Sequence, residues 1–229
     1  MIGAKGGRKH LYQIESMVQD THGYWIILSR KFKSGAERSV TVYAFPDRVW
    51  SWYSWPIFGG SAQIANLGAG IGYFGFPNND IRKTDDFRAS QQGLKETQLV
   101  YFNETQWLKP KLLRALPGKG IPRKVEAIET DLDGERVDFW IDREDHLPVK
   151  IIQYYQSEFR AGLQPGYTWE LSHYQQMNGI QIPYEVSYSV LSDRPSIDRF
   201  TTLLNPKLRE DLFTSPPRFE DGPDAWKPK

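Results

Sequence analysis

The segment from Val40 to Pro56, VTVYAFPDRVWSWYSWP, most constrains how this chain can fold. Two runs rich in β-branched and aromatic residues flank a Pro-Asp pair, which is typical of a β-hairpin. Successive side chains of a strand point to opposite faces, so Trp50 and Trp52 share one face while Tyr53 and Trp55 share the other. A strand with one wet face would alternate apolar with polar residues. We therefore expect a helix, a ligand or both to cover each face of this hairpin.

The composition indicates a globular, β-rich protein. Aromatic residues make up 14% of the 229 residues and charged residues 25%, which argues against disorder. The formal net charge of +1 provides no global field to attract nucleic acid or an anionic membrane, so we expect no nucleic-acid partner. The sequence contains no cysteine, which excludes disulfides, thiol catalysis and cysteine-bound metals.

The sequence leaves the cellular location open between two alternatives. No run approaches the roughly 18 apolar residues of a membrane-spanning helix, so no transmembrane segment is expected. The N-terminal sequence MIGAKGGRKHLYQI lacks the apolar core of a signal peptide. The protein is then either cytosolic, or exported by a signal that has been trimmed and is not part of this sequence.

The pattern of apolar residues predicts about ten strands joined by short turns, with helices inserted midway. The helical section is expected from Lys83 to Leu116. Its second helix should begin near Pro110 and present Leu112, Leu113 and Leu116 as an apolar stripe. The predicted fold class is α+β, mainly β, with one curved antiparallel sheet and a helical layer.

The chain shows no linker and no internal repeat, so a single domain over residues 1–229 is expected. Residues 1–15 are predicted to form an N-terminal helical segment, and residues 215–229 a proline-rich, extended C-terminal tail. A hairpin is predicted around Asp133-Gly134, the strongest short hairpin signal in the sequence. Another is predicted in the glycine-rich segment 59–77, where a G-x-G-x-x-G match is followed by turn residues and therefore does not indicate a dinucleotide site.

No group of residues indicates catalysis. The four histidines, at positions 10, 22, 146 and 173, lack the spacing of a zinc site. Asp142, Glu144 and Asp145 fall in a predicted turn, where acidic side chains are usually just solvated. No nucleophile elbow or phosphate-binding loop is present. We therefore predict a protein that is not an enzyme and holds no metal or cofactor.

Apolar residues are unusually dense, and two interpretations stay open. They form either a large ordinary core or a concave pocket between sheet and helices that holds an acyl chain. The residues predicted to line such a pocket come from the aromatic hairpin, the following hairpin and the leucine stripe: Trp50, Trp52, Tyr53, Trp55, Tyr73, Phe74, Leu112 and Leu116.

Four segments resemble the LolA-like proteins, the outer-membrane lipoprotein-sorting carriers and their relatives. Residues 42–52, VYAFPDRVWSW, look like the family's early strand-Pro-x-x-aromatic-x-Trp hairpin. Residues 66–74 resemble its next hairpin, and residues 137–150 its strand, turn and L-P-x-K segment. Residues 211–217, DLFTSPP, are similar to the F-T-x-P-P that closes the fold. The order of the segments matches along most of the chain.

The resemblance implies an incomplete, half-open antiparallel barrel whose helices form a lid on the concave face, over a hydrophobic cavity. It also implies non-covalent carriage of lipid or lipoprotein acyl chains in the periplasm, with envelope membrane proteins as candidate partners. The alternative is a lipid-sensing or protein-interaction module of an envelope stress system. The family's lipoprotein carrier has an arginine directly before the hairpin proline. This chain has Phe45 there and Arg48 beyond Pro46, so the resemblance supports the fold more than the release mechanism.

Overall fold

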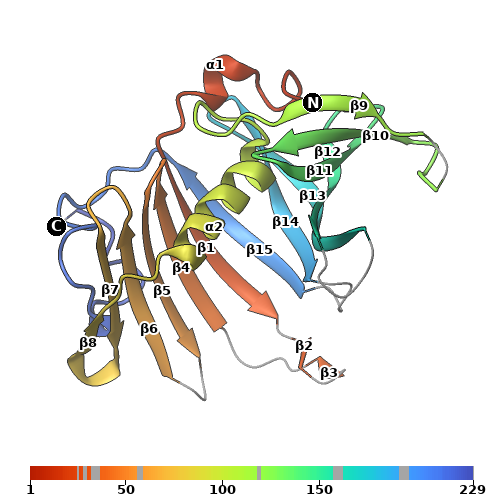
Figure 1. The fold of residues 1–229 in the computed structure, drawn as a ribbon. Coiled ribbons are helices and arrows are strands. Elements are labelled where there is room, and N and C mark those ends of the chain that lie inside the picture. Colours follow the sequence, from red (N-terminus) through yellow and green to blue (C-terminus); the bar gives the residue numbers. More distant parts are fainter. Residues whose placement is uncertain are drawn as a thin grey trace. The chain divides into compact units, whose positions relative to one another are not determined.

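The computed structural model describes residues 1–24, 26–27, 30–31, 37–55, 59–117, 120–156, 162–190 and 196–228. Within them the fold is mainly β, with few helices and an antiparallel sheet of 13 strands (Figure 1). The two-residue strands β2 (Ile26–Ile27) and β3 (Arg30–Lys31) pair separately. The expectation of about ten strands was too low. Strands at the two ends of the sheet order are short and exposed, so they lack the apolar alternation by which a strand is recognised.

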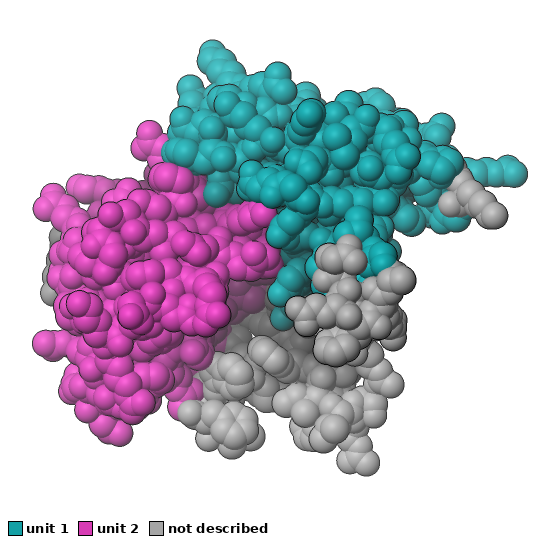
Figure 2. All heavy atoms as spheres, in the orientation of Figure 1, with its two compact units in different colours: residues 1–13, 98–198 teal, residues 14–97, 199–229 magenta. Residues whose placement is uncertain are grey.

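The chain is divided into two compact units, coloured separately in Figure 2. The first unit contains residues 1–13 and 98–198, and the second contains residues 14–97 and 199–229. Each unit therefore joins two stretches that are distant in the sequence.

The second unit contributes strands in the order β8-β7-β6-β5-β4-β1-β15, together with the helix α2 (Arg88–Thr97). Residues 199–204 of β15 belong to it, and the short helices η1 (Pro77–Asn79) and η3 (Phe219–Asp221) lie in its loops. The bounds of its strands are β1 Ser16–Tyr24, β4 Glu37–Ala44, β5 Arg48–Trp55, β6 Gly59–Asn66, β7 Ile71–Phe76, β8 Asp80–Lys83 and β15 Ser196–Leu204.

The predicted aromatic hairpin is confirmed as β4 and β5, with Val42 opposite Trp50 and Val40 opposite Trp52. The hairpin predicted in the glycine-rich segment is confirmed as β6 and β7. These tryptophans, with side chains in register with them, form the core of the second unit on one face of its sheet. We call it the tail face. The buried members of this core are Val18, Val40, Val42, Ala44, Trp50, Trp52, Ala62, Ile64, Leu212, Phe213 and Trp226.

The C-terminal segment covers the tail face. Leu212 and Phe213 are buried against the sheet, and so is Trp226 within the predicted tail of residues 215–229, where the ring of Phe219 also stacks on Trp52 with centroids 5.4 Å apart. The Trp52 indole N–H also donates to the Phe219 carbonyl at 2.9 Å. The segment therefore completes the core instead of leaving it.

Two glycines of β7 allow other segments to approach the sheet from opposite sides. A Cβ at Gly75 would overlap the carbonyl of Pro217, and one at Gly72 would overlap the ring of Phe87. At Gly72 and Gly75 the absence of a side chain therefore permits the close approach of backbone and ring to the strand.

The helical section predicted from Lys83 to Leu116 is only partly correct. The α2 helix is followed by η2 (Gln98–Phe102), a π-helical stretch, but the predicted second helix is strand β9 (Lys111–Ala115). Leu112 and Leu113 therefore do not form a helical stripe. A five-residue segment satisfies both helical and strand patterns, and hydrogen bonds to β10 decide between them.

The first unit contributes strands in the order β14-β13-β12-β11-β10-β9 and the short helix α1 (Arg8–Leu11), within the predicted N-terminal helical segment. The hairpin predicted at Asp133-Gly134 is confirmed as β10 and β11. The bounds of its remaining strands are β10 Val125–Leu132, β11 Glu135–Asp142, β12 Pro148–Gln156, β13 Leu163–Met177 and β14 Ile180–Val190.

The N-terminal segment is fixed to the first unit by a buried lysine. Lys5 is fully buried, its ammonium donates to the Gln181 carbonyl at 2.7 Å, and it lies 4.7 Å from the ring centroid of Tyr174. Burial lowers the pKa of Lys5 well below its ordinary value. Arg8 and Tyr12 both donate to the buried carboxylate of Glu104, at 2.6 and 2.5 Å, which ties the same segment to the end of η2.

Candidate functional site

The face of the second unit's sheet opposite the tail face lies against α2, and we call it the α2 face. Figure 1 shows α2 running across the strands of this unit. Gln63 of β6 donates to the hydroxyl of Ser90 on α2 at 3.1 Å, and Tyr43 of β4 is hydrogen-bonded to Thr97 at the end of the helix. These contacts fix which side chains of the sheet lie on this face.

The strand register arranges the α2 face in three rows. The row nearest the hairpin turn is largely apolar, and the next two consist of hydroxyl and amide side chains, with two aromatic rings at Tyr53 and Phe74. The apolar row contains Met17, Tyr43, Val49 and Ala65. The first polar row contains Gln19, Thr41, Ser51 and Gln63, with Phe74 at its end, and the second contains Thr21, Ser39, Tyr53 and Ser61.

Within the described part of the chain, two polar atoms of these rows are buried without a hydrogen-bond partner. Gln19 is 5% exposed and Ser61 2% exposed, and neither the Gln19 Nε2 nor the Ser61 Oγ is paired among the described residues. Buried polar groups are normally hydrogen-bonded, because desolvation otherwise costs about 1–3 kcal/mol each. The α2 face therefore has hydrogen-bonding capacity that the described part of the chain does not use.

A third such atom belongs to Thr202 of β15, the strand beside β1. The Asn205 N–H donates to the Ser16 carbonyl at 2.9 Å, and counting three residues along antiparallel strands from this bond pairs Thr202 with Gln19. The Thr202 side chain is also buried, with its Oγ1 unpaired among the described residues. Thr202 therefore extends the first polar row by one strand.

The polar rows contain no charged side chain, and burial shifts the pKa of two neighbouring ionisable groups upward. Desolvation raises the pKa of Tyr43, with a smaller opposing effect from its hydrogen bond to Thr97. Desolvation also raises the pKa of Glu96 on α2, against a hydrogen bond from Gln92 at 2.6 Å. A face of this kind suits a ligand with neutral hydrogen-bonding groups better than a phosphate or a carboxylate.

The predicted lining residues fall on both faces of the second unit and in the first unit. Trp50 (2% exposed), Trp52 (9%) and the half-buried Tyr73 lie on the tail face, packed on the C-terminal segment. Tyr53 and Phe74 are half-buried on the α2 face. The side chain of Trp55 lies outside the described residues.

The two predicted leucines lie in the first unit. Leu112 is 63% exposed on β9, and Leu116, which follows β9, donates its N–H to the Ala127 carbonyl at 2.8 Å. Among the described lining residues, the structure thus brings together Trp50, Trp52 and Tyr73 on one face, and Tyr53 and Phe74 on the other.

Sequence reasoning missed the polar rows, although the signal was present. In β4, β5 and β6 a serine, threonine or glutamine stands between successive apolar residues, as at Thr41, Ser51 and Gln63. This alternation is the ordinary pattern of an antiparallel strand with one apolar face, and the aromatic rings on the same strands make it less apparent.

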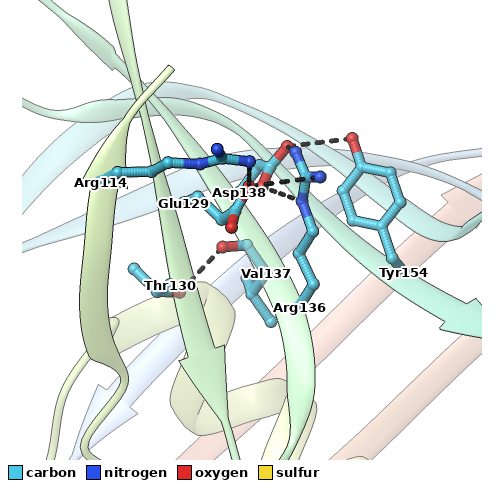
Figure 3. A network of polar contacts seen from close by, with 7 residues as sticks. All are labelled: Arg114, Glu129, Thr130, Arg136, Val137, Asp138 and Tyr154. Carbon is cyan, nitrogen blue, oxygen red and sulfur yellow. Dashed lines mark hydrogen bonds and ion pairs between the residues drawn. The ribbon is translucent and has the colours of Figure 1, made fainter. Parts of the chain in front are cut away.

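The first unit carries a second polar cluster, shown in Figure 3, in which the charges are paired. Arg136 donates twice to the buried carboxylate of Asp138, at 2.9 and 2.8 Å, and also contacts Glu129 at 3.2 Å. Tyr154 donates to Asp138 at 3.0 Å, and Arg114 to Glu129 at 3.0 Å. These contacts satisfy the carboxylates, so we assign the cluster a structural role.

No group of three or more His, Asp or Glu side chains among the described residues is arranged to hold a metal ion. No helix in the described part of the chain is both long and apolar enough to cross a membrane.

Solved structures of other proteins have a similar fold. The chain is similar to a LolA superfamily protein from Nitrosomonas europaea, with a TM-score of 0.61 at 13% identity, covering 93% of this chain and 96% of that one. The chain has the LolA fold. A putative outer membrane lipoprotein-sorting protein domain from Vibrio parahaemolyticus is also similar, with a TM-score of 0.53 at 11% identity, covering 87% of this chain and 89% of that one. No family model matches the chain, and no curated protein matches it in sequence.

The LolA fold predicted from four short motifs is thus found in the structure. At 11% and 13% identity the likeness concerns the fold alone, so the ligand and its site have to be argued from the side chains of this chain.

Proposed function

We propose that this protein is a non-catalytic carrier that binds the acyl chains of lipids or lipoproteins in the bacterial cell envelope. The observation that carries the proposal is the composition of the α2 face. A buried apolar row lies directly beside two uncharged polar rows that contain unpaired donors and acceptors. A surface of this kind suits an amphiphile whose polar part is neutral.

The two parts of the ligand would be bound differently. Met17, Val49 and Leu94 of α2 are buried apolar side chains that offer contact to a hydrocarbon chain, worth roughly 0.8 kcal/mol for each methylene buried. Gln19 and Ser61 offer hydrogen bonds to ester, amide or hydroxyl groups. Of the residues predicted to line the site, Tyr53 and Phe74 would contact this ligand.

The likeness to a putative lipoprotein-sorting domain supports the choice of ligand and of the periplasm as its location. In the polar cluster of the first unit, arginine side chains hold the carboxylates of Asp138 and Glu129, which supports a structural role for that cluster over a catalytic one. The fold would then act as a container whose α2 helix covers the bound chain.

Titration of the delipidated protein with a diacylated lipopeptide, followed by tryptophan fluorescence, tests the proposal. We expect Tyr53→Ser to weaken binding about tenfold, which corresponds to roughly 1.4 kcal/mol, because the half-buried ring lies on the α2 face. The same titration with the peptide lacking its acyl chains should show no binding.

Tyr73→Ser is the matched control, since it removes the same ring from the tail face of a nearby strand. It should lower the stability of the protein while leaving the affinity for the lipopeptide within about twofold. If the wild type binds no amphiphile, or if Tyr73→Ser weakens binding as much as Tyr53→Ser does, the α2 face is not the acyl site.

A further inference from the structure

Strand β9 presents an open edge of the first unit. It ends the strand order, and within the described residues it pairs with β10 alone, with a register shift between Glu129 and Thr130. All five residues of β9 are exposed, and Leu112 and Leu113 are 63% and 50% exposed. Successive residues of a strand point to opposite faces, so each face of β9 offers a leucine to solvent. An apolar edge strand is a template for another strand.

The sequence around β9 is strongly basic in a protein with a formal net charge of only +1. Residues 105–125 contain six lysines and arginines and no aspartate or glutamate. Lys111 lies opposite Asp131 of β10 but forms no ion pair among the described residues, and the Arg114 side chain stays 66% exposed while contacting Glu129. The edge therefore combines two exposed leucines with two basic side chains, Lys111 and Arg114, and contains no acidic residue of its own.

The edge strand of the second unit, β8, is different. Its charges are paired with each other, since Arg82 contacts Asp80 at 2.6 Å, and Arg82 also lies 5.1 Å from the ring centroid of Phe76. The N–H groups of Asn78 and Asn79, just before β8, donate to Glu220. The ion pair within β8 offsets part of its charge, whereas β9 contains no acidic residue that could pair with Lys111 or Arg114 inside the strand.

The chemistry of β9 selects among the partners that an edge can take. A second copy of the chain would bring Lys111 and Arg114 against their equivalents, and like charges facing each other across a strand pair are destabilising. A bilayer would leave the unpaired N–H and C=O groups of the edge without partners in hydrocarbon. An extended peptide satisfies these groups, and acidic side chains on it complement the cations.

We propose that β9 is a docking edge for an extended, acidic segment of another protein, which adds to the sheet as one more strand beside Lys111–Ala115. Apolar residues of the segment pack beside Leu112 and Leu113, and its carboxylates face Lys111 and Arg114. This interaction is separate from acyl-chain binding on the α2 face. It supplies the kind of surface that a protein-interaction module of the fold requires.

Selection of a random-sequence peptide library against the full chain tests the docking edge. We expect the enriched peptides to carry net negative charge and alternating apolar residues, and to protect the amides of β9 from hydrogen exchange when bound. Lys111→Glu should weaken their binding about tenfold, and raising the salt concentration should weaken it further. The double variant Leu112→Asn, Leu113→Asn should weaken it by a similar factor.

Chemical modification of the selected peptide separates strand pairing from other binding modes. N-methylation at alternate residues should abolish binding in one frame and preserve it in the other, because only every second N–H of an added strand faces β9. The matched control is Arg82→Glu on β8, which should leave the affinity unchanged.

Three results would overturn the proposal. The enriched peptides could bind without protecting β9, or N-methylation in both frames could have the same effect. In the third, no enriched peptide depends on Lys111. Vesicles containing phosphatidylglycerol bind the protein instead, and the double variant Leu112→Asn, Leu113→Asn loses this vesicle binding. That result would identify the edge as a membrane-contact surface.

Discussion

The polar cluster of the first unit and the α2 face of the second unit differ in whether their buried polar groups are hydrogen-bonded to one another. In the first, Arg136, Asp138 and Tyr154 satisfy one another at 2.8 to 3.0 Å (Figure 3). In the second, Gln19 and Ser61 are also buried but have unpaired atoms among the described residues. The first arrangement is complete by itself, whereas the second leaves hydrogen-bonding atoms unpaired within the described part of the chain.

This contrast explains why the burial of large apolar side chains does not by itself point to the α2 face. Trp50 is the largest side chain of the predicted set that is almost fully buried, and it packs on the C-terminal segment as a core residue. The groups that set the α2 face apart are small and uncharged. Their distinguishing feature is a missing hydrogen bond and not apolar area.

The largest effect should come from breaking the completed network. Asp138→Ala leaves the Arg136 guanidinium and the Tyr154 hydroxyl without their shared acceptor. We expect the free energy of unfolding to fall by about 3 kcal/mol, measured by urea denaturation, because the partly buried Arg136 charge loses the closer of its two acidic partners. Glu170→Ala is the control: its ion pair with Lys150 is exposed, and its loss should cost less than about 0.5 kcal/mol. Equal losses for both variants would contradict the assignment.

A smaller effect should appear at high pH. Burial, together with the nearby Asp138, raises the pKa of Tyr154 from its ordinary value of 10.0 to about 12. The folded state therefore keeps a proton that the unfolded state has lost, and this contribution is present below pH 10 and disappears as the pH rises to about 12. The stability difference between the wild type and Tyr154→Phe should shrink across this range in urea titrations. A constant difference would show that Tyr154 does not titrate with the network.

The smallest effect should come from the α2 face. Ser61→Ala removes a buried hydroxyl that has no partner among the described residues, so the free energy of unfolding should not fall. The control is Thr130→Val, which removes a buried hydroxyl that donates to the Val137 carbonyl at 2.8 Å and should cost about 1 kcal/mol. A cost for Ser61→Ala as large as that of Thr130→Val would mean that the Ser61 hydroxyl is already satisfied.

The sequence by itself determined the local pairings. The hairpins around Pro46-Asp47 and Asp133-Gly134 were predicted correctly, because their turn residues and strand patterns lie within a few residues of each other. Four motif segments, two of which overlap these hairpins, were also enough to indicate the LolA fold. The alternation of side chains along each strand also showed which of them share a face of the sheet.

Only the tertiary structure decided which of these two sets of side chains faces α2 and which faces the C-terminal segment. The aromatic hairpin carries rings on both faces, so its sequence could not tell whether Trp52 or Tyr53 would face α2. The C-terminal segment, more than 150 residues away in the chain, packs on the face that carries Trp52, where Phe219 contacts the Trp52 ring. Likewise, Lys111–Ala115 fits a helix or a strand by local pattern, and pairing with β10 made it a strand. Such choices depend on burial against distant segments, which a local pattern does not contain.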